Sequence, residues 1–369
     1  MTIEYPNYNE SLVSLASSIL RFYNAGDCGH GSLDCIDSIL SARNPMNVVL
    51  MLFDGFGYNI MNRNLPDSSF LRRHMVRSIS STFPPTTVAA TTALRSGMTP
   101  LENGWLGWFS YYSEMDEIVT TFTSHRQSDD TYVGRDLAGK YIPYVSVGSK
   151  VSKSNPDVTF TELTPFSKAG IDSLSKMESS LANLLTNGTR NFVYCYWPDP
   201  DRTMHGFGVN DPRSIEVERS IDSFVENISS RFNDTIFIIV ADHGLVDAKY
   251  LYFADHPKLL SMLKRPFSIE SRAATFFVKP ESLHEFGLEF ERCFGDHFML
   301  LRKDDFLSSG LLGVGMQHPM VDEFVGDYIA ISKDSYCLAM KKEADELIGI
   351  HAGLTQDEML VPLIVVDRT

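Results

Sequence analysis

Three short apolar runs, each followed closely by aspartate, constrain the fold of this chain more than any other feature. They cover residues 47–53, 191–197 and 235–241. Each run is continuous rather than alternating and is rich in β-branched, aliphatic or aromatic side chains, which is typical of strands buried on both faces. Helices must cover both faces of a sheet built from such strands. The runs therefore predict a parallel sheet between helical layers.

Helical and strand-like patterns alternate through most of the remaining chain. Helical spacing of apolar residues recurs in residues 10–42, where two short helices flank a glycine-containing turn, and in residues 171–185 and 214–232. Strand-like patterns occupy residues 118–123, 141–147 and 360–366. The predicted class is therefore α/β, with a central, mostly parallel sheet flanked by helices.

The pattern changes between about residues 250 and 345, where the predicted strands and helices are shorter and the charges denser. We expect residues 251–345 to form a smaller, inserted α+β cap. Residues 1–250 together with 346–369 then form the core, and residues 360–366 return a strand to the main sheet. No internal repeat, low-complexity tract or long linker divides the chain.

The charge and cysteine content of this 369-residue chain restrict its surroundings and partners. A net charge of −15 argues against non-specific binding to nucleic acid and against an anionic membrane surface. The five cysteines are scattered without Cys-x-x-Cys spacing, which fits thiols in a reducing cytosol. The first residues lack the pattern of a signal peptide, and the apolar runs are too short to span a bilayer. We therefore expect a cytoplasmic protein without a nucleic-acid or membrane partner.

Residues 81–104 predict a helix that starts at a pair of threonines. Pro84 and Pro85 fix the backbone and lack N–H donors, so they predict a stiff turn directly before Thr86 and Thr87. Residues 87–95 fit a helix that the following Ser-Gly could close. A hydroxyl at such a helix start faces unpaired N–H groups and the positive end of the dipole, which favours a phosphoryl group. The alternative is that either threonine only caps the helix.

Aspartate and histidine residues follow each of the three apolar runs and recur near the C-terminus. The candidates are Asp54, Asp201, His205, Asp242, His243 and His351. Mixed carboxylate and imidazole ligands suit Zn²⁺, or alternatively Mn²⁺, better than Ca²⁺ or Mg²⁺. Six such ligands and a threonine oxygen are enough for two divalent metal ions. A pair of ions can clamp the attacking and leaving oxygens of a displacement at phosphorus.

Each element of this set has a simpler explanation when taken alone. Asp54 and Gly55 could form only a turn, and Asp201 could cap a helix start beside an exposed His205. The Asp242-His243 pair at the end of an apolar strand is harder to explain in this way. All the strong strand candidates end in such residues, where open α/β sheets place their ligands, and this combination favours a metal centre.

Six motifs occur along the chain in the order LFDGFG, FPPTT, SGMTPLENG, DPDRTMHG, ADHGL and GIHAG. In that order they resemble the type I phosphodiesterase/nucleotide pyrophosphatase family of the alkaline phosphatase superfamily, over residues 50–369. The family pattern is a metal-binding Asp after the first strand, FPxxT with a threonine nucleophile, TGxxPxxHG, EPDxxGH, DHG and a late GxHG. The register from Thr87 to Gly97, Pro100 and Gly104 matches that pattern position by position.

The resemblance implies an alkaline-phosphatase-like catalytic core and a role for each candidate residue. Thr87, rather than Thr86, would be the nucleophile. One ion would be held by Asp54, Asp242 and His243 with the Thr87 oxygen, and the other by Asp201, His205 and His351. The implied activity is hydrolysis of phosphate diester or pyrophosphate bonds in a small-molecule phosphate ester, a nucleotide for example, through a covalent phosphothreonine.

Three departures from the family pattern bear on the substrate. Asn103 stands where the family has a His before Gly104, and Asp199 replaces the Glu of EPD. Trp108 falls at the register of an asparagine that orients the phosphate in many relatives. The surrounding aromatic run, residues 105–112, could stack a base, or it could pack beneath the loop.

The cations near these motifs favour one class of phosphate ester. Arg202 and Arg95 are the only ones close in sequence, and Arg95 lies roughly 12 Å along its helix from Thr87, too far to reach easily. Because a monoester usually needs an extra cation, we predict that a diester is the better substrate. The rivals are a phosphomonoesterase or phosphonate hydrolase on the same scaffold and a non-catalytic metal-binding protein. A sulfatase is disfavoured, since no CxPSR or SxPSR stretch is present.

Overall fold

The three apolar runs form neighbouring strands at the centre of one sheet. The computed structural model describes residues 1–369. Strand β1 (Asn47–Phe53) lies between β6 (Arg190–Trp197) and β7 (Thr235–Val240) and pairs with both in parallel. Every residue of β1 and β7 is buried. Burial on both faces is the environment that their uninterrupted apolar sequences require.

Three further strands complete this six-stranded sheet, in the order β2-β16-β7-β1-β6-β5. Strand β5 (Val158–Leu163) pairs in parallel with β6. Strand β16 (Leu360–Asp367) runs antiparallel to both β7 and β2 (Met75–Ser80). The predicted central, mostly parallel α/β sheet is therefore confirmed, and the last strand of the chain does return to it.

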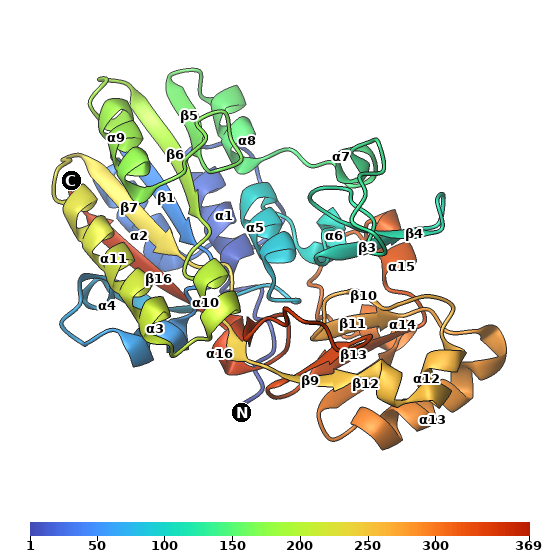
Figure 1. Cartoon of the computed structure of the whole chain (residues 1–369). Helices are drawn as coiled ribbons and strands as arrows, with labels where there is room; N and C mark the ends of the chain where they lie inside the picture. Colours follow the sequence, from blue (N-terminus) through green and yellow to red (C-terminus); the bar gives the residue numbers. More distant parts are fainter.

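Helices cover both faces of this sheet (Figure 1). One layer consists of α1 (Leu12–Phe22) and three helices that contact it, namely α2 (Asp34–Arg43), α5 (Thr87–Ser96) and α8 (Val147–Ser154). The other layer includes α9 (Leu174–Leu185), α11 (Pro212–Ser229) and α3 (Tyr58–Asn64). The largest apolar cluster of the protein joins the sheet to both layers.

A second, antiparallel sheet forms the other lobe, in the order β12-β13-β11-β10-β3-β4 (Figure 1). Four of its strands lie in the predicted cap: β10 (Ser268–Ile269), β11 (Ala273–Phe276), β12 (Phe298–Arg302) and β13 (Tyr328–Ser332). Strands β3 (Phe109–Tyr112) and β4 (Glu117–Thr120) join them where Phe109 pairs with Ile269. The domain boundaries, with a core of residues 1–250 plus 346–369 and a cap of residues 251–345, stay a prediction. In the structure, residues 109–120 of the predicted core pair with the sheet of the cap.

Helix α13 (Leu283–Phe294) covers the second sheet. Its Phe286, Phe290 and Phe294 are fully buried. Their four-residue spacing places all three rings on one face of the helix, where they pack with the apolar side chains of the sheet. The second lobe therefore has an apolar core of its own, separate from that of the first sheet.

The strand predicted at residues 141–147 is wrong. Helix α7 (Leu137–Tyr141) ends there, and α8 begins at Val147. Asp136 and Ser146 cap these two helices by accepting hydrogen bonds from the backbone N–H groups of Gly139 and Ser149. Two caps so close together fix helix starts on either side of the segment, and this outweighs its strand-like composition.

The remaining elements are short. They are α4 (Phe70–Arg73), α6 (Pro100–Asn103), α10 (Asp201–Phe207), β8 (Val246–Asp247), β9 (Lys249–Tyr252), α12 (Pro257–Met262), α14 (Lys303–Ser308), α15 (Pro319–Phe324), β14 (Tyr336–Ala339), β15 (Gly349–Ile350) and α16 (Gln356–Met359). None of the helices combines the length and the apolar character that a membrane crossing needs.

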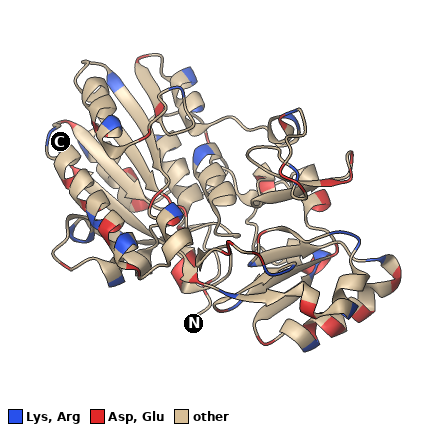
Figure 2. Ribbon diagram, in the orientation of Figure 1, with Lys and Arg blue, Asp and Glu red and all other residues tan.

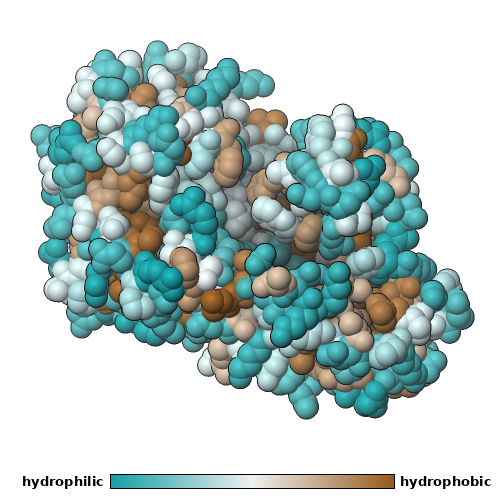
Figure 3. All heavy atoms as spheres, in the orientation of Figure 1, coloured by the Kyte–Doolittle hydropathy of each residue, from teal (hydrophilic) through white to brown (hydrophobic).

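Charged and apolar side chains are distributed differently over the molecule. Figure 2 shows acidic and basic residues mixed on the outer helices of both lobes. Figure 3 shows a hollow between the lobes, with apolar side chains at its edges. This hollow corresponds to a cavity of ≈ 1230 Å³ lined by residues of both lobes.

Candidate active site

The carboxyl ends of β1, β6 and β7 meet at the floor of this cavity. Asp54 directly follows β1, and α10, which follows β6 after a short turn, carries Asp201 and His205. Asp242 and His243 follow β7. Because these strands run in parallel side by side, their ends lie at one edge of the sheet. The fold thus brings together residues that are far apart in sequence.

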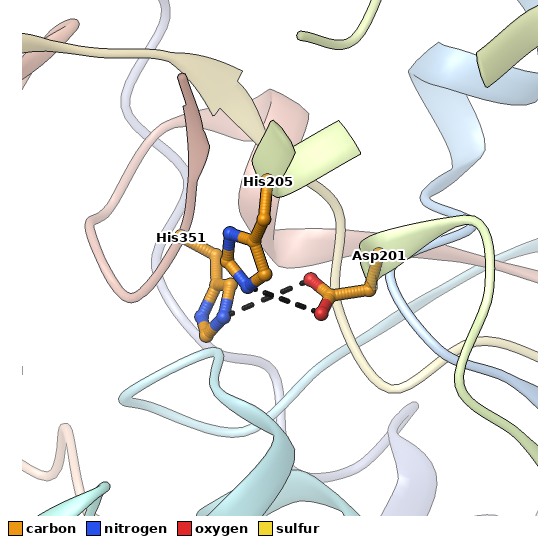
Figure 4. A group of neighbouring side chains, drawn as sticks. All are labelled: Asp201, His205 and His351. Atoms are coloured by element: carbon orange, nitrogen blue, oxygen red, sulfur yellow. Dashed lines mark ion pairs between the residues drawn. The ribbon is translucent and has the colours of Figure 1, made fainter. Parts of the chain in front are cut away.

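Asp201, His205 and His351 form a first group (Figure 4). His205 Nε2 lies 3.1 Å from Asp201 Oδ2, and His351 Nε2 lies 3.9 Å from Asp201 Oδ1. The Nδ1 atoms of the two rings bond to the backbone oxygens of Gly349, at 2.7 Å, and Pro85, at 3.2 Å. A carbonyl only accepts, so each Nδ1 donates and each Nε2 is free to bind a metal ion.

Asp54, Asp201 and His243 form a second group, beside Thr87. His243 Nε2 lies 3.4 Å from Asp54 Oδ1 and 3.5 Å from Asp242 Oδ2. The Thr87 hydroxyl lies 3.4 Å from Asp54 Oδ1 and 3.2 Å from His243 Nε2. All seven predicted site residues therefore lie together, and Asp201 takes part in both groups.

The two threonines at the start of α5 differ in what their hydroxyls contact. Thr86 occupies the position before the helix, but its side chain caps no backbone N–H. Its hydroxyl donates instead to Glu270 Oε1, at 2.6 Å. The Thr87 hydroxyl faces the carboxylate and imidazole groups. The simple capping explanation therefore fits neither threonine, and of the two hydroxyls that of Thr87 lies beside the candidate metal ligands.

The buried carboxylates of Asp54 and Asp242 lack a compensating lysine or arginine, whereas that of Asp201 is paired with His205. Burial, and then the neighbouring carboxylates of Asp242 and Asp201, raise the pKa of Asp54 well above its usual range. Burial also raises the pKa of Asp242. One oxygen on each of two carboxylates, Asp242 Oδ2 and Asp201 Oδ1, is buried without any hydrogen-bond partner. Orphaned carboxylate oxygens beside free imidazole nitrogens are what divalent metal ions would satisfy, so the residues fit such ions.

The pKa values of the two histidines in the first group are shifted in opposite directions. Burial alone would lower the pKa of His205, but the carboxylate of Asp201 raises it to about 9. Burial, and then the nearby His243, lower the pKa of His351 well below its usual range. Its ring stacks on that of His243 with centroids 3.9 Å apart, so His351 is held neutral, the form that binds metal.

Three residues of the site carry no motif that the sequence analysis could detect. The Tyr196 hydroxyl donates to Asp54 Oδ2, and the Ser81 hydroxyl donates to the backbone oxygen of Asp242. Glu270 lines the cavity from the second lobe, and burial raises its pKa to about 7. Tyr196 belongs to a run recognised only as a strand. Glu270 follows a two-residue strand that has no pattern of its own.

The aromatic residues of the run 105–112 fall into two sets, since some pack beneath the loop and others line the cavity, where they could stack a base. Trp105, Tyr111 and Tyr112 are buried in the second lobe, beneath the loop. Trp108 and Phe109 line the cavity, and the Trp108 side chain is 42% exposed. Further rings complete the aromatic part of the lining: Phe122, Phe166, Tyr194, Tyr196, Tyr250 and Phe267.

Two arginines line the cavity, and each is paired with a carboxylate. Arg95 reaches the cavity although it lies far along α5, because helical side chains tilt towards the N-terminus. It donates to Glu162 Oε1 at 2.9 Å, and Arg202 donates to Asp199 Oδ2 at 2.6 Å. No lysine lines the cavity. The expectation that Arg95 lies too far along its helix to reach the site is therefore wrong, since Arg95 lines the same cavity as Thr87, where it is paired with Glu162.

Comparisons with known proteins identify the family and the fold of the chain. The model of the type I phosphodiesterase / nucleotide pyrophosphatase family matches residues 48–352. No curated protein sequence matches the chain. Because the family match covers most of the chain, the resemblance inferred from the motifs is confirmed.

Solved structures show the same fold at low sequence identity. Human ectonucleotide pyrophosphatase/phosphodiesterase 5 has a TM-score of 0.66 at 15% identity and covers 87% of each chain. Its murine counterpart, solved as an inactive threonine-to-alanine variant in complex with AMP, has a TM-score of 0.63 at 15% identity, over 86% of this chain and 87% of that one. Phosphonoacetate hydrolase from Sinorhizobium meliloti, solved with phosphonoformate, has a TM-score of 0.63 at 14% identity, over 87% of this chain and 90% of that one. The alkaline-phosphatase-like fold is therefore confirmed.

Proposed function

Because the chain belongs to the type I phosphodiesterase/nucleotide pyrophosphatase family, we propose that it hydrolyses phosphate diester or pyrophosphate bonds through Thr87 and two divalent metal ions. One observation carries the proposal. The Thr87 hydroxyl lies at the start of a helix, 3.4 Å from Asp54 Oδ1 and 3.2 Å from His243 Nε2. A hydroxyl in that position can become a nucleophile once a cation lowers its pKa.

The ligand assignment follows the two groups of side chains. One ion would be held by Asp54, Asp242, His243 and Thr87, and the other by Asp201, His205 and His351. The orphaned oxygens of Asp201 and Asp242 support this assignment. The mixture of carboxylates and imidazoles favours Zn²⁺, with Mn²⁺ as the alternative.

The chain's own residues account for most of the proposed reaction. Bound ions would stabilise the Thr87 alkoxide and neutralise charge on the phosphoryl oxygens. The Thr87 oxygen loses its proton and attacks phosphorus in line, the bond from phosphorus to the leaving oxygen breaks on the opposite side, and the leaving oxygen takes up a proton. The backbone N–H groups at the start of α5 face the charge that develops on the phosphoryl group. Water then breaks the bond between phosphorus and Thr87, and the hydroxyl regains its proton.

The substrate we propose is a small diester with an aromatic substituent, such as a nucleoside ester. Trp108 and Phe122 offer ring faces on one side of the cavity, with centroids 6.1 Å apart, and Phe166 and Tyr196 offer another pair, 6.2 Å apart. The AMP complex of the murine relative supports the nucleoside substituent, although AMP itself is a monoester. We also propose a cytoplasmic location, supported by five cysteines that form no disulfide.

A phosphonate hydrolase is the second candidate. The relative from Sinorhizobium meliloti is as similar in fold as the murine pyrophosphatase, with a TM-score of 0.63 for each. A phosphonate or monoester dianion would need a cation besides the metal ions, whereas Arg95 and Arg202 are already paired. The diester is therefore the first choice.

The test is a substrate panel with one zinc- or manganese-loaded sample. We expect bis-p-nitrophenyl phosphate or p-nitrophenyl thymidine monophosphate to have a higher kcat/KM than p-nitrophenyl phosphate or phosphonoacetate. A preference for the monoester by about tenfold, or about 1.4 kcal/mol in transition-state binding, would instead favour a phosphomonoesterase. Tight metal binding without turnover of any ester would favour a non-catalytic metal-binding protein.

A further inference from the structure

Glu270 reaches the cavity from the second lobe and lies beside the reactive helix start. Its Oε1 accepts hydrogen bonds from the Thr86 hydroxyl, at 2.6 Å, and from the Trp108 backbone N–H, at 2.8 Å. These are the only hydrogen bonds of the Glu270 carboxylate to the protein, and both use the same oxygen. Its Oε2 therefore has no protein partner, in a residue that lines the cavity next to Thr87.

The backbone that presents Glu270 is held in an unfavourable conformation. The preceding residue, Ile269, has a φ of +68°, which a β-branched residue rarely adopts. The only other β-branched or alanine residue at positive φ is Ala352, at +91°, and it directly follows the metal-ligand candidate His351. Strain of this kind persists only where surrounding contacts enforce it, and it gathers at functional sites.

One buried ion pair holds both strained segments. Arg272, two residues after Glu270, donates to both carboxylate oxygens of Glu358, each at 2.7 Å, and neither residue is exposed to solvent. Glu358 Oε1 also accepts from the backbone N–H of Gly353, at 2.7 Å. Glu270 is thus fixed in place by the same contact that fixes the segment of His351.

The charge of Glu270 is not balanced by a neighbouring side chain. The arginines of the cavity are paired with Glu162 and Asp199, and no lysine or arginine contacts Glu270. The Trp108 backbone N–H also donates to Glu270, so it is not free to donate to a substrate.

We propose that Glu270 is a specificity-determining residue that selects the charge of the substrate. A diester carries one negative charge on its phosphoryl group and a monoester carries two. A fixed carboxylate beside the phosphoryl site repels the second charge, so it disfavours monoester dianions and admits diester monoanions. This inference rests on the proposed function, because it assumes that a phosphoryl group binds beside Thr87.

The variant Glu270→Gln removes the charge and keeps the contacts. The amide oxygen of glutamine can still accept from Thr86 and from the Trp108 N–H, so the loop should keep its shape. Binding of inorganic phosphate and of dimethyl phosphate to metal-loaded protein is measured by titration calorimetry at a pH of about 8, where phosphate is mostly a dianion. We expect the variant to bind phosphate about tenfold more tightly than the wild type, equivalent to about 1.4 kcal/mol, and dimethyl phosphate, which carries half the charge, only about threefold more tightly.

A kinetic measurement accompanies the binding data. The ratio of kcat/KM for p-nitrophenyl phosphate to that for bis-p-nitrophenyl phosphate should rise about threefold in Glu270→Gln. Glu323→Gln is the matched control, since Glu323 also binds a backbone N–H, that of Ser113 at 2.6 Å, but lies outside the cavity. Thr86→Val keeps the carboxylate and removes the hydroxyl that it binds, so it should not shift either ratio towards the monoester.

Three results would overturn the inference. They are an unchanged ratio of phosphate to dimethyl phosphate affinity in Glu270→Gln, the same rise in ratio in Glu323→Gln or Thr86→Val, and a loss of bound metal in Glu270→Gln, which would make Glu270 a ligand. Failure of the proposed function is a separate result. The wild type could hydrolyse none of the esters while Glu270→Gln still gains affinity for phosphate over dimethyl phosphate. That result would contradict the phosphodiesterase activity and support the selection of substrate charge by Glu270.

Discussion

The two lobes contribute to the cavity in different ways. The first sheet provides metal-ligand candidates at the ends of three adjacent parallel strands, with Asp54 and Asp242 completely or almost completely buried. The second lobe provides Glu270, Trp108 and other side chains that face the space where a substrate would lie. On the proposed function, the reactive groups gather at one sheet edge, and selection of the substrate depends on how the second lobe is placed against that edge.

The largest effect is expected on turnover, when the proposed nucleophile Thr87 of the first lobe is replaced. We expect Thr87→Ala to lower turnover of a diester by on the order of a thousandfold or more while the protein stays folded, because the covalent step is lost. Thr86→Ala should be far milder, since the Thr86 hydroxyl contacts Glu270 and not the ligand groups. Steady-state kinetics with both variants decide this. Equal activity of the two, or greater sensitivity at position 86, would contradict the assignment.

The next largest effect is expected on stability, at the buried ion pair between Arg272 of the second lobe and Glu358 of the first. Glu358→Gln leaves the Arg272 guanidinium buried with only part of its hydrogen bonds, so we expect the free energy of unfolding to fall by about 3 kcal/mol. Chemical denaturation measures the change. Glu216→Gln breaks an exposed pair with Arg219, whose atoms are 3.8 Å apart, and should change the free energy by less than about 0.5 kcal/mol. Similar small effects for both variants would show that the buried pair does not hold the lobes together.

A buried carboxylate outside the site offers a comparison with those that metal ions would compensate. Burial raises the pKa of Glu218 on α11 to about 8, against the opposing hydrogen bond from Asn64. The folded state therefore holds this proton more tightly than the unfolded state. The resulting stability is fully present below the unfolded pKa of about 4.5 and is lost as the pH rises through about 8.

Glu218→Gln removes this dependence. We expect the variant to be more stable than the wild type by on the order of 1–2 kcal/mol at a pH of about 9, and the difference to vanish towards a pH of about 5. Thermal melts at several pH values provide the measurement. A difference that stayed constant with pH would mean that Glu218 is ionised in the folded protein throughout.

The smallest effect is expected at Trp108, one of the aromatic residues that line the cavity. Trp108→Ala keeps the backbone N–H that binds Glu270 and removes the ring, so we expect KM for an aryl or nucleoside diester to rise several-fold, or about 1 kcal/mol. Phe207→Ala is the control, because Phe207 is equally exposed, at 42%, but does not line the cavity. An equal rise in KM in both variants would show that the Trp108 ring does not contact the substrate.

Much of the first lobe could be predicted from the sequence because its signals are local. The run at residues 47–53 is apolar throughout, and this alone identifies a buried strand; the Asp that ends it then falls at the ligand-binding edge. The strand ends identified the six ligand candidates and the motifs identified Thr87, and the structure brings all seven together. The position of Asp201 between the two groups, however, depends on tertiary distances that no motif contains.

The second lobe could not be predicted to the same degree. Strand β10 has only two residues, and strand β3 reaches it from about 160 positions earlier in the chain, so neither periodicity nor spacing reveals the sheet. Glu270 follows that short strand and has no motif. The strand expected at residues 141–147 failed for a related reason, since the side-chain caps of two flanking helices decide the local structure.

The most direct test of the account is the metal content of the protein purified without chelator. The account predicts close to two transition-metal ions per chain by elemental analysis. It also predicts that Asp242→Asn or His351→Ala lowers both this number and the melting temperature, because metal binding stabilises the folded state. A metal-free protein whose melting temperature does not change on addition of zinc would contradict the two-metal site and, with it, the proposed role of Thr87.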